Sequence, residues 1–208
     1  MTSKFPEPPR PEVLRARAAD WRSLPAGTEL WRVYFRGGSY PTFWNLLREH
    51  GPTASRFDHH LPPARSQERA ILYAAESGLT ALAEVFQATR TIERAGRSPW
   101  LAGFRLARPL RLLDLTGTWP TRAGASMALS TGPRPRAQRW SRAIYAAFPS
   151  AEGLYYGSAM HANRPVVALY ERGAAALPPH PSFHRALDDP CLLTALRNAA
   201  RELGYLLL

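Results

Sequence analysis

Hydrophobic residues recur along the chain in short clusters whose spacing predicts both strands and helices. Apolar residues alternate with other residues at Leu30–Phe35, where Val and Tyr favour a strand. Further strands are predicted at Arg69–Ala74, Trp100–Leu106, Leu110–Leu115, Gly153–Gly157 and Val166–Tyr170. Because strands and helices do not alternate regularly, the pattern favours an α+β fold.

A helical spacing of apolar side chains predicts the helices. Ser77 is placed to cap a helix from Gly78 to Arg90, in which Leu79, Leu82, Ala83 and Phe86 form the apolar stripe. The other predicted helices are Val13–Trp21, Gln138–Phe148 and an amphipathic terminal helix over Asp188–Leu206. Phe43–Glu49 is predicted as helix or loop, 117–136 as mostly loop, and 173–182 as a connection.

The length of 208 residues predicts one domain with an appendage. Residues 1–27 carry several prolines and are predicted to form an N-terminal arm, extended over its first dozen residues. Residues 28–208 are predicted to form a single domain that includes the C-terminal helix, which packs on the core or contributes to a homo-oligomer interface.

The chain carries 27 Lys and Arg against 16 Asp and Glu, a net charge of +11, and Lys4 is its only lysine. This excess has two interpretations: a generally basic surface, or a partner with phosphates or carboxylates, which guanidinium groups bind in a bidentate manner. The single cysteine, Cys191, excludes an intrachain disulfide and fits a reducing compartment. No secretory signal and no long apolar run is found, so we expect a cytoplasmic location and no membrane partner.

Four polar residues are candidates for chemistry because they interrupt apolar elements or lie in a loop. Arg32 is in the first strand, Arg56 is in a loop, Tyr73 ends a strand, and Glu84 borders the apolar stripe of its helix. Each has a plain alternative: a solvent-facing or surface arginine, a core tyrosine, or a solvated carboxylate. Together they suit a phosphate-bearing ligand and chemistry at a sugar carbon.

Other motifs carry weaker signals. Ser130-Thr131-Gly132 and Tyr156-Gly157-Ser158 place hydroxyls beside glycine, where they can bind phosphate or ribose or serve as ordinary turns. His59 and His60 invite a metal interpretation, which is not favoured because the other histidines are scattered. The dinucleotide-binding and P-loop glycine motifs and the hydrolase elbow are absent from the sequence.

The ordered motifs resemble those of the RES domain family over about Leu30 to Arg172. The segments that carry the resemblance are Trp31-Arg32-Val33, Arg56-Phe57-Asp58, Leu72-Tyr73, Ala83-Glu84-Val85, Leu113-Asp114-Leu115-Thr116, Leu129-Ser130-Thr131-Gly132, Gln138 to Ile144, Gly153 to Ser158 and Val167 to Tyr170. The chain departs from the common Gly-Gly-Arg-Trp-Asn pattern at Ser55-Arg56-Phe57-Asp58.

This resemblance implies an ADP-ribosyltransferase-like mixed β core with flanking helices, NAD+ as substrate and no metal. It implies a toxin of a bacterial toxin–antitoxin system, neutralised by a helix-turn-helix (Xre-like) antitoxin. By motif, Arg32, Tyr73 and Glu84 match catalytic residues, and Arg32, Arg56 and Tyr73 match residues that bind NAD+. Ser130 and Ser158 both stand in segments that match the family serine, so both are candidates for binding NAD+.

Three functions follow as hypotheses. The first is a toxin that consumes NAD+ as a glycohydrolase or phosphorylase. The second is an ADP-ribosyltransferase acting on a host protein. The third is a basic nucleic-acid-binding module, which no recognised motif supports and for which the arginines are too dispersed.

Overall fold

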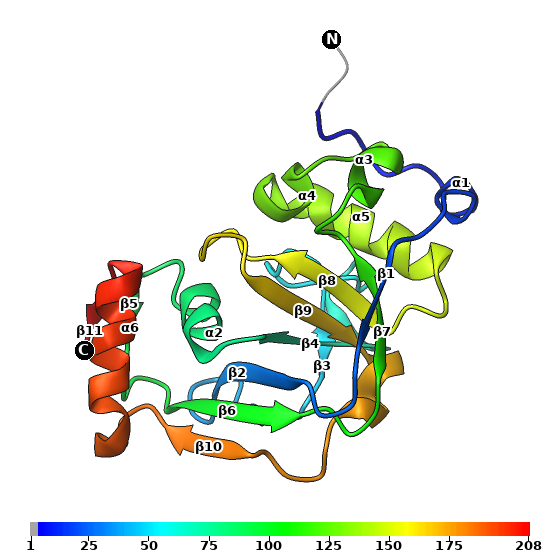
Figure 1. The fold of residues 1–208 in the computed structure, drawn as a ribbon. Helices are drawn as coiled ribbons and strands as arrows, with labels where there is room; N and C mark the ends of the chain where they lie inside the picture. Colours follow the sequence, from blue (N-terminus) through cyan, green and yellow to red (C-terminus); the bar gives the residue numbers. More distant parts are fainter. Residues whose placement is uncertain (1–3) are drawn as a thin grey trace.

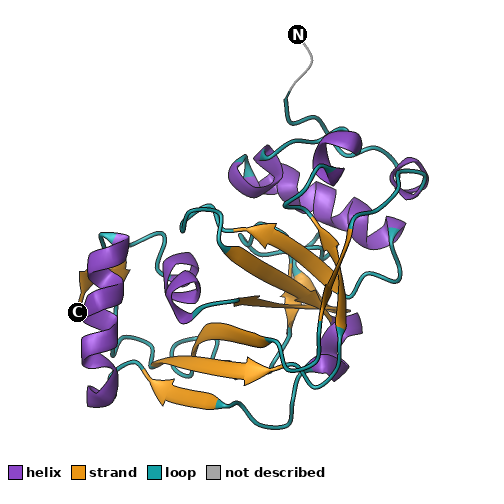
Figure 2. Ribbon diagram, in the orientation of Figure 1, coloured by secondary structure: helices purple, strands orange, loops and turns teal. Residues whose placement is uncertain are grey.

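The computed structural model describes residues 4–208, so the first three residues of the predicted arm lie outside the described part. The centre of the described chain is a mixed sheet (Figures 1 and 2). Its nine strands are β1 (Trp21–Leu24), β2 (Glu29–Phe35), β3 (Arg48–Gly51), β4 (Arg65–Ala75), β6 (Pro99–Arg105), β7 (Leu110–Asp114), β8 (Gly153–Gly157), β9 (Pro165–Tyr170) and β10 (Phe183–Ala186).

The strand order is β1-β7-β8-β9-β4-β2-β6-β10, and β3 pairs with β4. The pair β7–β8 is parallel, whereas the other strand pairs of this sheet are antiparallel. β2 pairs with β6 along its whole length, but β2 and β4 meet in register only at Trp31 and Ala75. The two halves of the sheet therefore diverge at β2 and β4.

Helices cover two ends of this sheet (Figure 1). The helices α1 (Pro11–Arg15), α3 (Trp119–Arg122), α4 (Ala128–Thr131) and α5 (Arg134–Ala147) gather at one end. The other elements are α2 (Gly78–Val85), α6 (Leu193–Leu203), the 3-10 turns η1 (Glu171–Ala176) and η2 (Pro190–Leu192), and a parallel pair of short strands, β5 (Thr91–Ile92) and β11 (Leu206–Leu207). α6 and this strand pair lie at the opposite end, with α2 between them and the sheet.

The longest helix, α5, packs because its apolar residues recur at helical spacing. Its buried side chains include Ala137, Trp140 and Ile144. The indole N–H of Trp140 also donates a 2.9 Å hydrogen bond to the Pro6 carbonyl, which fixes the N-terminal segment against the helix. α6 is followed by the C-cap residue Gly204, whose left-handed backbone (φ 66°) is readily adopted by glycine.

The α+β prediction is confirmed, and each of the six predicted strands overlaps a strand of the sheet. The helix predicted at Gln138–Phe148 corresponds to α5. The helix predicted over Val13–Trp21 is present only up to Arg15, where α1 ends, and Trp21 begins β1, which pairs with β7. Part of the predicted N-terminal arm thus belongs to the sheet.

Other boundaries also differ from the prediction. α2 ends at Val85, since Phe86 leaves helical backbone geometry and Arg90 has a positive φ of 52°. The terminal helix begins at Leu193 and not at Asp188, and Leu206 belongs to β11. The region 117–136 contains the short helices α3 and α4, and β10 occupies residues for which no strand was predicted.

Candidate functional site

A cavity of about 940 Å³ lies where β2 and β4 diverge. It is bounded by these two strands, by the segment that joins β2 to β3, and by α2. Its lining residues include Trp31, Arg32, Val33, Tyr40, Pro41, Thr42, Leu46, Leu47, Arg48, Tyr73, Ala81, Glu84 and Val85. The three residues predicted to be catalytic, Arg32, Tyr73 and Glu84, therefore share one cavity.

Arg32 extends from the middle of β2 and is held at one nitrogen. Its Nη1 donates to the carbonyls of Trp44 and Leu46 at 2.9 and 3.0 Å. Burial lowers the pKa of Arg32 to about 10, which still leaves the guanidinium charged at neutral pH. Its other N–H groups have no hydrogen-bond partner within residues 4–208, so they are available to an anion in the cavity.

Tyr73 extends from β4 into the same cavity. Its hydroxyl is buried and makes no hydrogen bond of standard geometry within the described chain. Burial raises the pKa of Tyr73, as does the Asp58 carboxylate, whereas the Phe57 peptide group lowers it slightly. The hydroxyl is enclosed by protein while Tyr73 as a whole is half-buried and lines the cavity, so a ligand there meets the side of the ring and not the hydroxyl.

Glu84 is bonded to one of the two candidate serines. The Ser158 hydroxyl donates to Glu84 Oε1 at 2.5 Å, and its oxygen accepts from the backbone N–H groups of Met160 and His161. These contacts orient the hydroxyl toward Glu84. Gly157 allows the turn, because an added Cβ would lie 2.1 Å from Asn163 Oδ1.

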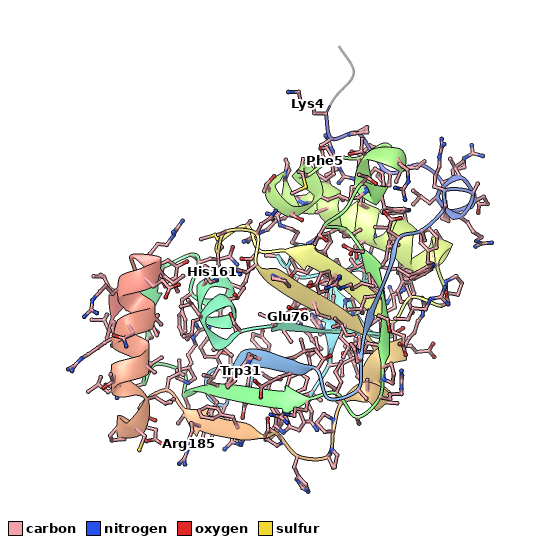
Figure 3. All side chains as sticks on the ribbon, in the orientation of Figure 1. Lys4, Phe5, Trp31, Glu76, His161 and Arg185 are labelled. Atoms are coloured by element: carbon pink, nitrogen blue, oxygen red, sulfur yellow. The ribbon has the colours of Figure 1, made fainter. Side chains whose placement is uncertain are left out.

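The turn that carries Ser158 is also attached to the start of α2. His161 lies beside α2 (Figure 3), and its Nδ1 is 2.9 Å from Thr80 Oγ1. Ser77 caps the same helix by accepting a hydrogen bond from the Thr80 N–H. The predicted cap at Ser77 is confirmed. Two contacts therefore hold the Ser158 turn against α2: the bond from Ser158 to Glu84 and the contact between His161 and Thr80.

Arg56 lies near Glu84 but does not line the cavity. Its Nη1 donates to the Gly132 carbonyl at 2.5 Å and to the Leu129 carbonyl at 3.5 Å. Burial lowers the pKa of Arg56, and the neighbouring Arg134 lowers it further; Tyr156, Glu84 and Tyr73 act in the opposite direction. Arg56 is therefore within electrostatic reach of the Glu84 carboxylate.

Ser130 stands elsewhere. It is buried in α4, next to one of the carbonyls that hold Arg56, and it makes no side-chain hydrogen bond to Glu84 or Tyr73. The structure thus brings Ser158 but not Ser130 into contact with Glu84.

The segment that follows Arg56 is fixed by a buried carboxylate. Asp58 accepts hydrogen bonds from Thr53, from the N–H and Nδ1 of His60, and from Arg48 at 2.9 Å. Although burial opposes it, these contacts hold the pKa of Asp58 well below its usual range. The adjacent His59 is also buried, stacked on Tyr145 with ring centroids 4.5 Å apart.

Acid is expected to destabilise this protein because of three groups. Burial lowers the pKa of His59 below 6.5. Burial would raise the pKa of Glu171, but hydrogen bonds from His59 and Tyr145 lower it to about 2. The pKa of Asp58 is also lowered. The unfolded chain therefore binds protons at a higher pH than the native chain. The midpoint of urea unfolding should fall as pH drops below about 6.5 and more steeply below about 4.5, whereas a constant midpoint from pH 7 to 4 would contradict this.

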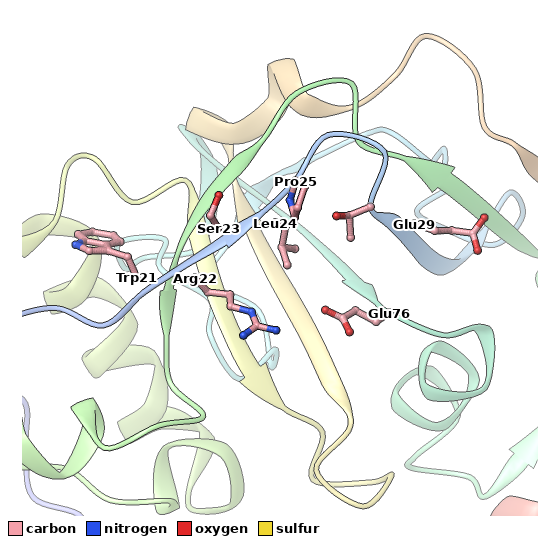
Figure 4. Close-up of a pocket in the computed structure, with 8 residues that line it drawn as sticks. Trp21, Arg22, Ser23, Leu24, Pro25, Glu29 and Glu76 are labelled. Carbon is pink, nitrogen blue, oxygen red and sulfur yellow. The ribbon is translucent and has the colours of Figure 1, made fainter.

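A second hollow contains none of the predicted site residues (Figure 4). It has a volume of about 570 Å³ and is lined by β1, the turn after it, and Glu76. Glu76 accepts a 2.9 Å hydrogen bond from the Tyr155 hydroxyl, which together with burial raises the pKa of Tyr155 to about 12.

Two residues of the site were not predicted from the sequence. Tyr156 is buried, and its pKa is raised well above 10 by burial and by the charge of Glu84. Arg48 lines the cavity and pairs with Asp58. Tyr156 belongs to the motif Tyr156-Gly157-Ser158, and its position beside Ser158 is the sequence signal that indicates a place near the site.

Within residues 4–208, no group of three or more His, Cys, Asp or Glu side chains is arranged to hold a metal ion. The described helices include none with the length and apolar character needed to cross a membrane.

The fold and the cavity define an α+β protein whose mixed sheet opens around a pocket with a largely apolar wall that also carries Arg32, Arg48 and Glu84. The profile of the RES domain family matches residues 29–189, and the chain belongs to this family.

Among solved structures, the M. tuberculosis MbcT–MbcA toxin–antitoxin complex contains a chain of similar fold, with a TM-score of 0.59 and 17% sequence identity. The match covers 90% of this chain and 96% of that chain. The comparison with curated proteins found no match. The mixed β core with flanking helices that the sequence implied is confirmed.

Proposed function

We propose that this protein is the toxin of a toxin–antitoxin pair and consumes NAD+ by cleaving the bond between nicotinamide and ribose. One observation carries the proposal: a single cavity joins Arg32, Tyr73 and Glu84, and Ser158 is hydrogen-bonded to Glu84. Membership of the RES domain family supports the same chemistry.

The cavity suits a ligand of this kind. A volume of about 940 Å³ lies within the range for pockets that enclose small ligands. Arg32 has free N–H groups for the pyrophosphate, and the charge of Arg56 adds to the positive potential. The Tyr73 ring on the cavity wall can pack against the nicotinamide–ribose end of the ligand.

Glu84 is placed to stabilise the charge that develops during cleavage. When the bond from ribose C1″ to nicotinamide breaks, the electron pair goes to the pyridinium nitrogen and leaves positive charge on the ribose. A carboxylate beside that charge lowers the barrier. Ser158 occupies Oε1 of Glu84, so Oε2 remains for the ribose or for the acceptor. The acceptor then bonds to C1″ and loses a proton to Glu84 or to solvent.

The partner belongs to the same proposal. In the structurally similar M. tuberculosis complex a toxin is bound to an antitoxin. On this chain Leu46 and Val85 line the cavity and are also exposed, so a bound protein would bury apolar surface at its mouth. We propose a helix-turn-helix antitoxin that covers this mouth.

The test is to incubate purified protein with NAD+ and to follow nicotinamide release, with and without phosphate. ADP-ribose would identify water as the acceptor, and ADP-ribose-1″-phosphate would identify phosphate. A labelled protein band, with a cell extract present, would favour the alternative of ADP-ribosyl transfer to a host protein. If the folded protein releases no nicotinamide under any of these conditions, the proposal is wrong.

The two candidate serines give a matched pair of variants. Ser158→Ala should lower kcat about tenfold or more, because it removes a hydrogen bond to a charged group at the reacting centre. Ser130→Ala should leave kcat within about twofold, because Ser130 has no such bond. Circular dichroism would check that both variants fold. Equal losses in the two variants would remove the assigned role of Ser158.

A further inference from the structure

Tyr40 is an aromatic residue of the cavity that the protein itself leaves uncovered. Its side chain is 91% exposed, although it lines the cavity together with Pro41, Thr42 and Leu46. Single exposed apolar residues are common on protein surfaces, and Phe43 (58% exposed, not lining the cavity) is one nearby. What distinguishes Tyr40 is its ring at the edge of a ligand-sized cavity.

The segment that carries Tyr40 is anchored on both sides of the residue. Before it, the Gly37 N–H donates to the Arg97 carbonyl at 3.0 Å. After it, the Thr42 N–H donates to the Phe35 carbonyl at 2.8 Å, and Arg32 holds the Trp44 carbonyl. Tyr40 therefore lies on a short loop with fixed ends, which places the ring near the cavity and leaves its faces open.

The burial of the residues around Glu84, compared with the exposure of Tyr40, indicates which part of a bound dinucleotide lies next to the Tyr40 ring. Glu84 lines the cavity and is bonded to the buried Ser158, so the reacting end of the ligand lies at the enclosed side of the cavity. Tyr40 is exposed to solvent, so it lies at the mouth. The end of NAD+ that does not react is its adenine, a flat ring whose face stacks on aromatic side chains.

We propose that Tyr40 stacks on the adenine of bound NAD+ and contributes to the affinity for the dinucleotide. This inference rests on the proposed function and adds a subsite to it. Binding energy from the remote adenine holds the ligand while Glu84 acts on the ribose. Tyr40 touches no reacting atom, so its loss should affect KM more than kcat.

The test compares Tyr40→Ala, Tyr40→Phe and Phe43→Ala in steady-state NAD+ cleavage. Tyr40→Ala should raise KM about fivefold to tenfold with kcat within about twofold, and it should weaken inhibition by ADP-ribose but not by nicotinamide. Tyr40→Phe keeps the ring and should retain most of the affinity. Phe43→Ala, an exposed aromatic of the same segment, should match the wild type.

An unchanged KM in Tyr40→Ala would overturn the proposal. An equal rise in Phe43→Ala would also overturn it, because the effect would then belong to the segment as a whole. Weakened inhibition by nicotinamide alone would place the ring at the wrong end of the ligand. If the wild type cleaves no NAD+, the proposed function fails; the adenine contact is then judged by calorimetry, where equal ADP-ribose affinity of wild type and Tyr40→Ala overturns it.

Discussion

Glu84→Gln is expected to lower kcat for NAD+ cleavage by about 10²- to 10³-fold while the fold is retained. Glutamine has nearly the same shape, and its amide oxygen can still accept the hydrogen bond from Ser158. It lacks the negative charge that opposes the positive charge developing on the ribose. The loss should therefore appear in kcat, with KM little changed.

The matched control for this variant is Glu76→Gln. Glu76 undergoes the same chemical change but lies in the second hollow (Figure 4), away from the cavity of Glu84. It should retain wild-type kinetics. In cells, expression of the wild type should arrest growth and lower NAD+, and the Glu84→Gln variant should do neither. Full activity in Glu84→Gln would exclude a role for this carboxylate in the chemistry.

The sequence predicted Arg32, Tyr73 and Glu84 because each lies within an element whose local pattern is strong. Alternation defined the strand of Arg32, and a short, mostly apolar run defined the buried strand of Tyr73. The Ser77 cap and the apolar stripe defined the helix of Glu84. Once these elements pack together, all three side chains reach one cavity. The residue roles themselves remain predictions until variants are measured.

Other features depend on distances that no local pattern contains. The choice of Ser158 over Ser130 depends on a turn that meets α2 across the fold. The cavity depends on β2 and β4 diverging after one registered pair, although both strands were predicted. Tyr156 was not predicted because a tyrosine in a fully buried strand has the pattern of an ordinary core residue.

The short strands were missed for a related reason. β1 and β10 lie at the two ends of the strand order, and each contains only four residues. Such a stretch is too short to show alternation, and its strand conformation comes from pairing with β7 or β6. The proline-rich composition therefore predicted that Trp21–Leu24 belongs to an N-terminal arm, whereas these residues form β1.

Asp58→Ala is expected to reduce the free energy of unfolding by about 3 kcal/mol, the largest stability loss that we predict for a polar residue. Asp58 is fully buried and accepts from Arg48, Thr53 and His60. Without the carboxylate, the Thr53 and His60 N–H groups and part of the Arg48 charge lose their partner. Urea unfolding at pH 7, followed by circular dichroism, measures the change.

Two further variants separate the buried network from a general effect of removing negative charge. Asp58→Asn keeps an acceptor oxygen but not the charge, so its loss should lie between wild type and Asp58→Ala. Asp188→Ala removes an exposed carboxylate and should change stability by less than about 0.5 kcal/mol. Because Asp58 fixes the turn next to Arg56, Asp58→Asn should also weaken NAD+ binding even where the protein remains folded. A stable Asp58→Ala variant with wild-type KM would show that this network neither supports the fold nor positions Arg56.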